Sequence, residues 1–214
     1  MTNVKGPEKK LIRRKLVRAA IDTLEKEGWK VTRVRGGGKG RLRRIAKDAT
    51  VRLAAIRTSQ DTWIAFPRND DDTAWVTLSE VDVVVAVSVD DPERPQHAQV
   101  HFLEADELRE HFDRAYAART AAGHTITKGR GVWVSLYHEE GTSPVQRVGA
   151  GIGNTHPPIA RIPLGGDGDH VPPIASSGAS GADDDLPLTI ADAKRRLART
   201  LGVRPDNIRI TVEA

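Results

Sequence analysis

The chain has 214 residues, of which 38% are hydrophobic and only 4% aromatic, so we expect one domain of ordinary size together with segments that do not pack. It contains no cysteine, which excludes a disulfide framework, a thiolate zinc site and a cysteine nucleophile. No apolar run approaches the roughly 18 residues of a membrane span, and the first ten residues lack the apolar region of a signal peptide. We therefore expect a cytoplasmic protein of a bacterium, with no membrane partner.

The net charge of +4 is divided unevenly along the chain. Residues 1–60 hold 18 lysines and arginines against 5 acidic residues, a balance of +13, whereas the rest of the chain carries a balance of −9. A basic half favours a polyanionic partner, because each phosphate that a cation neutralises releases counterions. The alternative is a solvated basic surface without a partner.

Residues 7–28 predict an amphipathic helix. Pro7 suits the first helical turn and Gly28 suits the position just after the end of the helix. Apolar residues recur along one face, and lysines and arginines cover much of the remaining surface. Residues 29–34 then alternate as a short strand.

A glycine-rich segment follows at residues 36–40. It fails the pattern of a phosphate-binding P-loop, because Lys39 is followed by Gly40 and not by serine or threonine. We expect a flexible basic loop that can lie along a phosphate backbone.

The next segment, residues 41–66, predicts a hairpin and a further strand. The first hairpin strand is crowded with cations, and the second ends in a polar cluster. The predicted parts are a strand over 41–46, a tight turn at 47–50, a strand over 52–57, the polar cluster 58–61 and an apolar strand over 63–66.

Residues 81–89, VDVVVAVSV, are nearly all apolar and β-branched, which is typical of a central strand covered on both faces. Residues 99–103 predict another strand, residues 104–121 a helix, and residues 131–137 a short alternating strand. Together these elements predict an α/β fold of the α+β type with a mixed sheet.

The composition changes after Glu140. Residues 141–187 are rich in glycine, proline, serine and aspartate, so we expect a disordered linker between a domain at 1–140 and a small helix–strand module at 188–214. A module of this size rarely folds alone. We therefore expect it to dock on a protein partner, on a second copy of the chain or on the main domain, and an adaptor function through this module is one alternative.

The order of elements over residues 5–125 resembles that of the PD-(D/E)xK nuclease-like superfamily, the fold of many restriction enzymes and Holliday-junction resolvases. Residues 54–59, AAIRTS, look like the strand that carries the acid-x-lysine triplet of that superfamily, and residues 80–108 look like its later strand pair and helix. The resemblance implies a restriction-endonuclease-like core.

The resemblance also implies a catalytic site that this chain departs from. Catalysis in that superfamily needs two or three carboxylates to hold Mg²⁺ and a lysine to position or activate water. The matching triplet here is Ala55, Ile56 and Arg57. A methyl group cannot bind a metal, and a guanidinium stays protonated and cannot act as a base. We expect a degenerate member that binds nucleic acid without hydrolysis or cofactor.

An active nuclease with relocated acids is the second alternative, and only this alternative needs Mg²⁺. Asp48 and Asp61 are the nearest acids in the sequence, with Arg57 as a third weak catalytic candidate. Asp48 lies in the predicted turn, where its ordinary role is to hydrogen-bond the backbone.

The candidate contacts to nucleic acid, with DNA as the first expectation, belong to the basic half of the chain. They are Arg13, Arg14, Arg18, Lys39, Arg41, Arg43, Arg44, Lys47, Arg57, Ser59 and Gln60. Trp63 and Trp75 can stack on bases or belong to the core. The seven histidines show no metal-ligand spacing, and we expect them at the surface.

Overall fold

The strand β5 (Val83–Val89) lies inside a mixed sheet and is covered on both faces. All seven of its residues are buried. β5 runs parallel to β3 (Thr50–Thr58) on one side and antiparallel to β6 (His97–Glu104) on the other. The prediction of a central strand from its continuous β-branched composition is confirmed.

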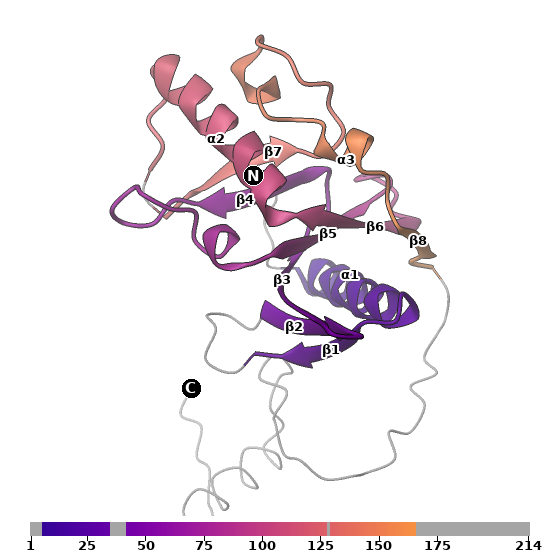
Figure 1. Cartoon of the computed structure of the whole chain (residues 1–214). Coiled ribbons are helices and arrows are strands. Elements are labelled where there is room, and N and C mark those ends of the chain that lie inside the picture. Colours follow the sequence, from indigo (N-terminus) through magenta and orange to yellow (C-terminus); the bar gives the residue numbers. More distant parts are fainter. Residues whose placement is uncertain (1–5, 35–41, 128, 166–214) are drawn as a thin grey trace, which may run out of the picture. The chain divides into compact units, whose positions relative to one another are not determined.

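The computed structural model describes residues 6–34, 42–127 and 129–165. The chain divides into two units, residues 1–167 and 168–214, and all described residues belong to the first. Its larger sheet has the strand order β1-β2-β3-β5-β6-β8, and β4 pairs with β7 in a second sheet (Figure 1). The remaining strands are β1 (Lys30–Arg33), β2 (Leu42–Lys47), β4 (Trp63–Pro67), β7 (Gly131–Ser135) and β8 (Ala160–Pro163). The fold is of the predicted α+β class with a mixed sheet.

The helix α1 (Pro7–Lys26) covers one face of the larger sheet. Leu16, Ala20 and Leu24 are fully buried and belong to the same apolar cluster as alternate residues of β5. Just beyond the helix, Gly28 takes a positive φ of 87°, which residues with a side chain adopt at a cost. The predicted helix is confirmed.

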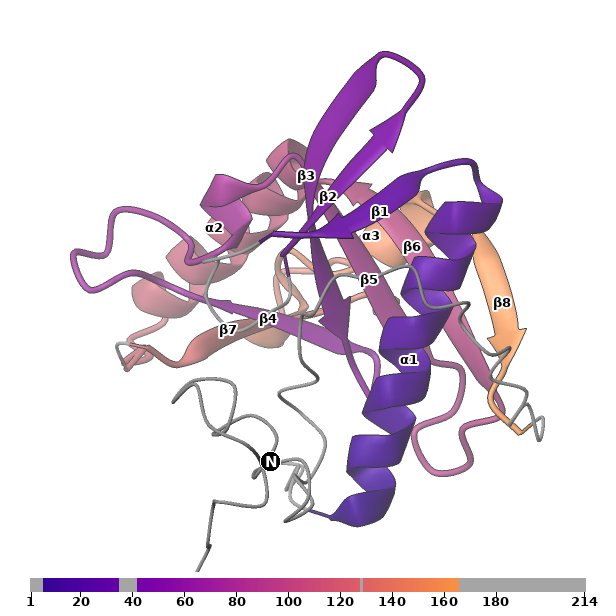
Figure 2. The ribbon, with the colours of Figure 1, turned by 90° about the horizontal axis from the view of Figure 1, so that it is seen from below.

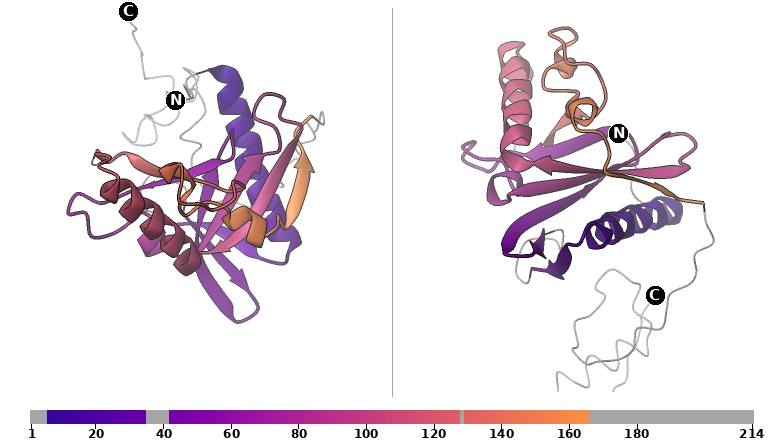
Figure 3. Two further views of the ribbon diagram at one scale, coloured as in Figure 1. Left: turned by 90° about the horizontal axis from the view of Figure 1, so that it is seen from above. Right: turned by 45° about the vertical axis from the view of Figure 1, so that its right-hand side comes forward.

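The opposite face of the sheet is covered by α2 (Ala105–Ala121) and by the β4–β7 pair, as the right panel of Figure 3 shows. Phe66 of β4 and Phe112 of α2 meet edge to face, with ring centroids 5.1 Å apart. The structure thus has two apolar clusters, one on each side of the larger sheet.

The hairpin of β2 and β3 closes at the predicted turn. Lys47 pairs with Thr50, and Asp48 takes a left-handed conformation with φ of 52°. Aspartate tolerates that conformation better than most residues, which explains its place in the turn. Figure 2 shows the tip of this hairpin projecting from the sheet.

The prediction that a disordered linker begins at residue 141 is wrong. The chain continues through the short helices η3 (Val145–Arg147) and α3 (Ile152–Thr155) into β8, which pairs with β6. The domain boundary at 140 is therefore also wrong, since this segment belongs to the same fold. Residues 166–187 and the predicted module at 188–214 lie outside the described residues.

The glycines of residues 141–165 suggested a linker by composition, but in the structure they allow the backbone to pack closely. A Cβ atom added at Gly149 would lie 2.1 Å from the carbonyl oxygen of His111 in α2. One added at Gly153 would lie 2.9 Å from the carbonyl oxygen of Leu136. Glycine here lets two backbones touch, whereas in a linker it would only add freedom.

None of the helices in the described ranges is long and apolar enough to cross a membrane.

Candidate functional site

The predicted triplet lies in β3, with Ala55 and Arg57 on one side of the strand and Ile56 on the other. Ala55 is fully buried and pairs with Leu42 of β2. Both side chains belong to the apolar cluster beneath α2. The position that the resemblance assigns to a metal-binding acid is therefore a methyl group among hydrocarbon side chains.

Arg57 is held at the end of β3 against an aromatic ring. Its guanidinium carbon lies 4.3 Å from the ring centroid of Phe66 in β4. A cation over the face of an aromatic ring is attracted by the ring quadrupole, and this contact orients the guanidinium at the end of the strand.

The polar cluster after β3 forms a closed turn. The Ser59 hydroxyl lies 2.5 Å from the carbonyl oxygen of Trp63 and also contacts the Asp61 carboxylate. That carboxylate accepts the backbone N–H of Trp63 at 2.8 Å. Ser59 and Asp61 are thus used to shape the turn, and this is the observed role of Asp61.

Gln60 joins this turn to α1. Its side-chain amide donates to the carbonyl oxygen of Lys9 at 2.6 Å. The end of β3 and the first turns of α1 are therefore neighbours. Lys47, in contrast, donates to the carbonyl oxygen of Glu27 at 2.7 Å, close to the other end of α1. At 1.5 Å per helical residue, the carbonyl groups of Lys9 and Glu27 lie about 27 Å apart along α1, so Gln60 and Lys47 bond opposite ends of the helix.

Asp48 is separated from the triplet. It sits in the turn before Thr50, and the five residue-to-residue steps from Thr50 to Ala55 span about 17 Å of extended strand. Within the described residues, no group of three or more histidines, aspartates or glutamates could hold a metal ion.

The outer side of α1 carries the densest set of cations. Lys15 donates to the carbonyl oxygen of Leu164 at 2.7 Å, and Arg18 pairs with Asp22 at 2.8 Å. Within the described part of the chain, Lys9, Lys10 and Arg13 form no ion pair with an acidic group. The first turns of α1 thus present positive charge that the folded domain does not neutralise.

The cations of β1 and β2 lie on both faces of the sheet. Arg43 faces the α1 side, next to Arg33 in register, and Arg44 faces the other side and is exposed. Burial lowers the pKa of Arg43, and the charge of Arg33 lowers it further. The alternation means that these arginines cannot all meet one ligand. Lys39 and Arg41 lie outside the described residues.

A buried polar cluster on the α2 side of the sheet was missed by sequence reasoning. Ser88 and His101 are fully buried, and the Tyr137 hydroxyl lies 2.7 Å from the Ser88 hydroxyl and 2.8 Å from Nε2 of His101. The Nδ1 atom of His101 lies 2.8 Å from the carbonyl oxygen of His156. The expectation of surface histidines is therefore wrong for His101, and its place in an alternating strand gave no sign of its polar partners.

The protonation of His101 and Tyr137 follows from these contacts and from burial. A carbonyl only accepts, so Nδ1 of His101 donates, and Nε2 of the neutral ring is an acceptor. The Tyr137 hydroxyl has a single proton, and the amide oxygen of Gln99 at 2.9 Å is a second acceptor for it beside Nε2. Burial lowers the pKa of His101; the hydrogen bond to the His156 carbonyl opposes this in part, and a charge on His156 adds to it. Burial also raises the pKa of Tyr137. These contacts run to neighbouring protein groups, which indicates a structural role for the cluster.

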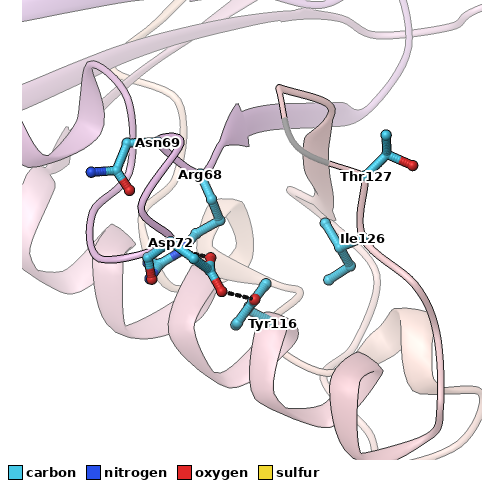
Figure 4. Close-up of a pocket in the computed structure, with 6 residues that line it drawn as sticks. All are labelled: Arg68, Asn69, Asp72, Tyr116, Ile126 and Thr127. Carbon is cyan, nitrogen blue, oxygen red and sulfur yellow. Dashed lines mark hydrogen bonds and ion pairs between the residues drawn. The ribbon is translucent and has the colours of Figure 1, made fainter.

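A small pocket lies beside α2, at the loop after β4. Figure 4 shows Arg68 and Asp72 close to Tyr116 at one side of it. The guanidinium of Arg68 lies 4.9 Å from the ring centroid of Trp75 and 5.1 Å from that of Tyr116, and it pairs with Asp72. The pocket has a volume of about 110 Å³ and is lined by Arg68, Asn69, Asp72, Tyr116, Ile126 and Thr127. The guanidinium of Arg68, the cation of this pocket, already contacts protein groups. Trp75 is buried in the core.

The chain matches no protein-family model, and no significant match to it was found among curated proteins or among solved structures. No residue role is therefore carried over from a relative.

Proposed function

We propose that this chain binds nucleic acid, with DNA as the first candidate, through the cationic side of α1 and the adjoining end of β3, on a nuclease-like core that has lost hydrolysis. Phosphate contacts supply most of the affinity of such proteins, and lysine and arginine are the side chains that make them.

The observation that carries the proposal is the set of cations in the first turns of α1. Lys9, Lys10 and Arg13 have no acidic partner within the described ranges. Surface charges of one sign repel each other, so a cluster without counter-charges favours an anionic ligand. Gln60 and Arg57 lie at the neighbouring end of β3 and add donors that suit phosphate oxygens.

The residues of the triplet and the nearest acids favour binding without hydrolysis. Ala55 is buried in an apolar cluster, Asp61 is engaged in the turn that it shapes, and Asp48 lies at the far end of the hairpin. Phosphodiester hydrolysis by this kind of site needs carboxylates that converge on a metal. We expect duplex and single-stranded DNA to stay intact in Mg²⁺ or Mn²⁺; cleavage that disappears in Asp61→Ala or Asp48→Ala would favour the nuclease alternative.

Binding is tested with fluorescent oligonucleotides at two salt concentrations. The variant Lys9→Ala/Lys10→Ala/Arg13→Ala should bind all sequences more weakly, and its salt dependence should be shallower by about one unit of log slope for each phosphate that the variant no longer neutralises. The matched control is Arg94→Ala/Arg130→Ala/Arg147→Ala, which removes the same charge from exposed arginines of other loops and short elements.

The two triple variants separate a binding surface from a net-charge effect. If both lower the affinity equally, the attraction is only that of a positive protein for a polyanion. If neither changes the affinity or the salt slope, the basic side of α1 is a solvated surface and the proposal fails.

A further inference from the structure

The outward side of the β4–β7 pair carries an exposed tryptophan. Along β4, Ile64 and Phe66 are buried, and along β7, Val132 and Val134 are buried, so these residues form the inner side. The residues between them point the other way. Trp133 is one of these, and it is 54% exposed.

A second indole lies on the same side of this pair. Ala65 pairs with Trp133, and Trp63 pairs with Ser135, so Trp63 and Trp133 are diagonal neighbours. In a regular antiparallel pair such neighbours lie roughly 7 to 8 Å apart, which is within reach of aromatic side chains. His138 extends the row, because its ring meets that of Trp63 edge to face with centroids 5.3 Å apart.

The neighbours of Trp133 leave its ring accessible. Ala65 lies opposite it, and Gly131 lies two residues before it on the same side of β7. A Cβ atom at Gly131 would lie only 2.8 Å from the Cβ atom of Ala65, so this part of the surface admits no larger side chain. The main chain is held as well, since Arg119 of α2 donates to the carbonyl oxygen of Trp133.

The Trp63 end of this aromatic row lies near the first turns of α1. Trp63 follows the turn in which Gln60 bonds the carbonyl oxygen of Lys9, so the first residue of β4 is tied to the first turns of α1. Flat π surfaces beside unneutralised cations are the combination that binds single strands, because bases stack on the rings and phosphates contact the cations.

We infer that the outward side of β4 and β7, with Trp133 at its centre, stacks the unpaired bases of a single-stranded nucleic acid whose phosphates bind the first turns of α1. This inference rests on the proposed function and names its substrate class. Bases inside a duplex are stacked on each other and offer no free face, so the chain should prefer single strands over duplex at equal salt.

The test compares oligo(dT), oligo(rU), duplex DNA and an abasic phosphodiester strand, each of about 15 nucleotides, a length near the upper site size of one single-strand-binding domain. Trp133→Ala should weaken binding of the two base-bearing single strands by about fivefold or more, as expected for the loss of one stacked base. It should change binding of the abasic strand by less than twofold. Trp133→Phe should retain most of the affinity, because a ring remains.

Ile159→Ala is the matched control, since Ile159 is an exposed apolar residue before β8 and lies outside the aromatic row. It should bind every probe as the unaltered chain does. The ratio of the oligo(dT) and oligo(rU) affinities tells whether the single strand is DNA or RNA.

Three results would overturn the inference. Trp133→Ala could bind all single strands unchanged while the triple cation variant still weakens them, in which case the proposed function stands and only the stacking surface fails. Trp133→Ala could weaken the abasic strand as much as oligo(dT), which would rule out stacking. Sedimentation could show that Trp133→Ala dissociates an oligomer without changing nucleic-acid affinity, which would make this side a protein contact. If no probe binds at all, the proposed function fails together with the inference.

Discussion

The two faces of the larger sheet are built in different ways. The centre of the face toward α1 is hydrocarbon, with Val83, Val85 and Val87 packed in one cluster with Leu16 and Leu24. The face toward α2 includes polar side chains that are fully buried. Ser88 and His101 lie there. Both side chains hydrogen-bond the Tyr137 hydroxyl, and His101 also hydrogen-bonds the carbonyl oxygen of His156.

The difference separates two kinds of stabilisation. On the α1 side, stability depends on the volume of the apolar groups, which have no directional partners. On the α2 side, each buried polar group must meet a specific partner, because an unpaired one loses its hydration without compensation. The first face should therefore respond to changes in volume, and the second to changes in hydrogen bonding, backbone approach and pH.

The largest effect is expected on the α1 side. Leu16→Ala removes a fully buried side chain and should lower the free energy of unfolding by about 2–5 kcal/mol in a urea titration. Leu11→Ala changes an exposed leucine of the same helix and should stay within about 0.5 kcal/mol. Equal losses from the two variants would show that α1 does not pack as described.

The docking of residues 141–165 is tested next, at Gly149. Gly149→Ala places a Cβ atom against the backbone of His111 and forces a positive φ of 77°, so we expect a loss of about 3 kcal/mol, the upper end for strained backbone. Gly123→Ala has a similar φ of 79° but open space around it, and should lose about 1 kcal/mol. Amide exchange should rise across 141–165 in the first variant alone. Unchanged protection would contradict the close approach of this segment to α2.

Tyr137→Phe removes the hydroxyl that links Ser88 and His101 without opening a large cavity. We expect a loss of about 2 kcal/mol, the cost of leaving buried polar groups unpaired. Tyr116→Phe removes a hydroxyl that bonds the exposed Asp72, and should change stability by less than about 1 kcal/mol. If the two variants are equally stable, the cluster around His101 adds no specific stabilisation to the α2 face.

The same cluster should make stability depend on pH. The pKa of His101 is lowered in the folded state, so below its unfolded value of about 6.5 the unfolded chain binds the proton more readily. The stabilisation is complete above that pH and is lost as the pH falls, with a slope of at most about 1.4 kcal/mol per pH unit. His101→Gln should flatten the curve between pH 5 and 7. An unchanged slope would assign the dependence to other histidines.

The smallest effect is expected on the outer side of α1. Arg18→Ala breaks an exposed pair with Asp22 on the next turn and should lower stability by no more than about 0.5 kcal/mol. A larger loss in thermal unfolding would mean that the basic side of the helix contributes to the fold. Little or no loss would mean that these cations can serve binding without a cost to stability.

Much of the fold was predictable because its elements carry local patterns. The apolar stripe of α1, the β-branched run of β5 and the turn at Asp48 each act over a few residues, and each was predicted in its place. β8 and the short helices before it were not, because a glycine that allows close packing has the same composition as one in a flexible linker.

For the candidate site, the sequence alone determined that a methyl group and a guanidinium stand at the triplet, because residue identity does not depend on folding. It also determined the excess of cations in the first 60 residues. Only the tertiary structure decided that Gln60 joins Lys9, that Trp63 and Trp133 share one side, and that Tyr137 reaches His101. These contacts connect residues between 36 and 70 positions apart, and they arise from strand pairing and packing that no local pattern in the chain encodes.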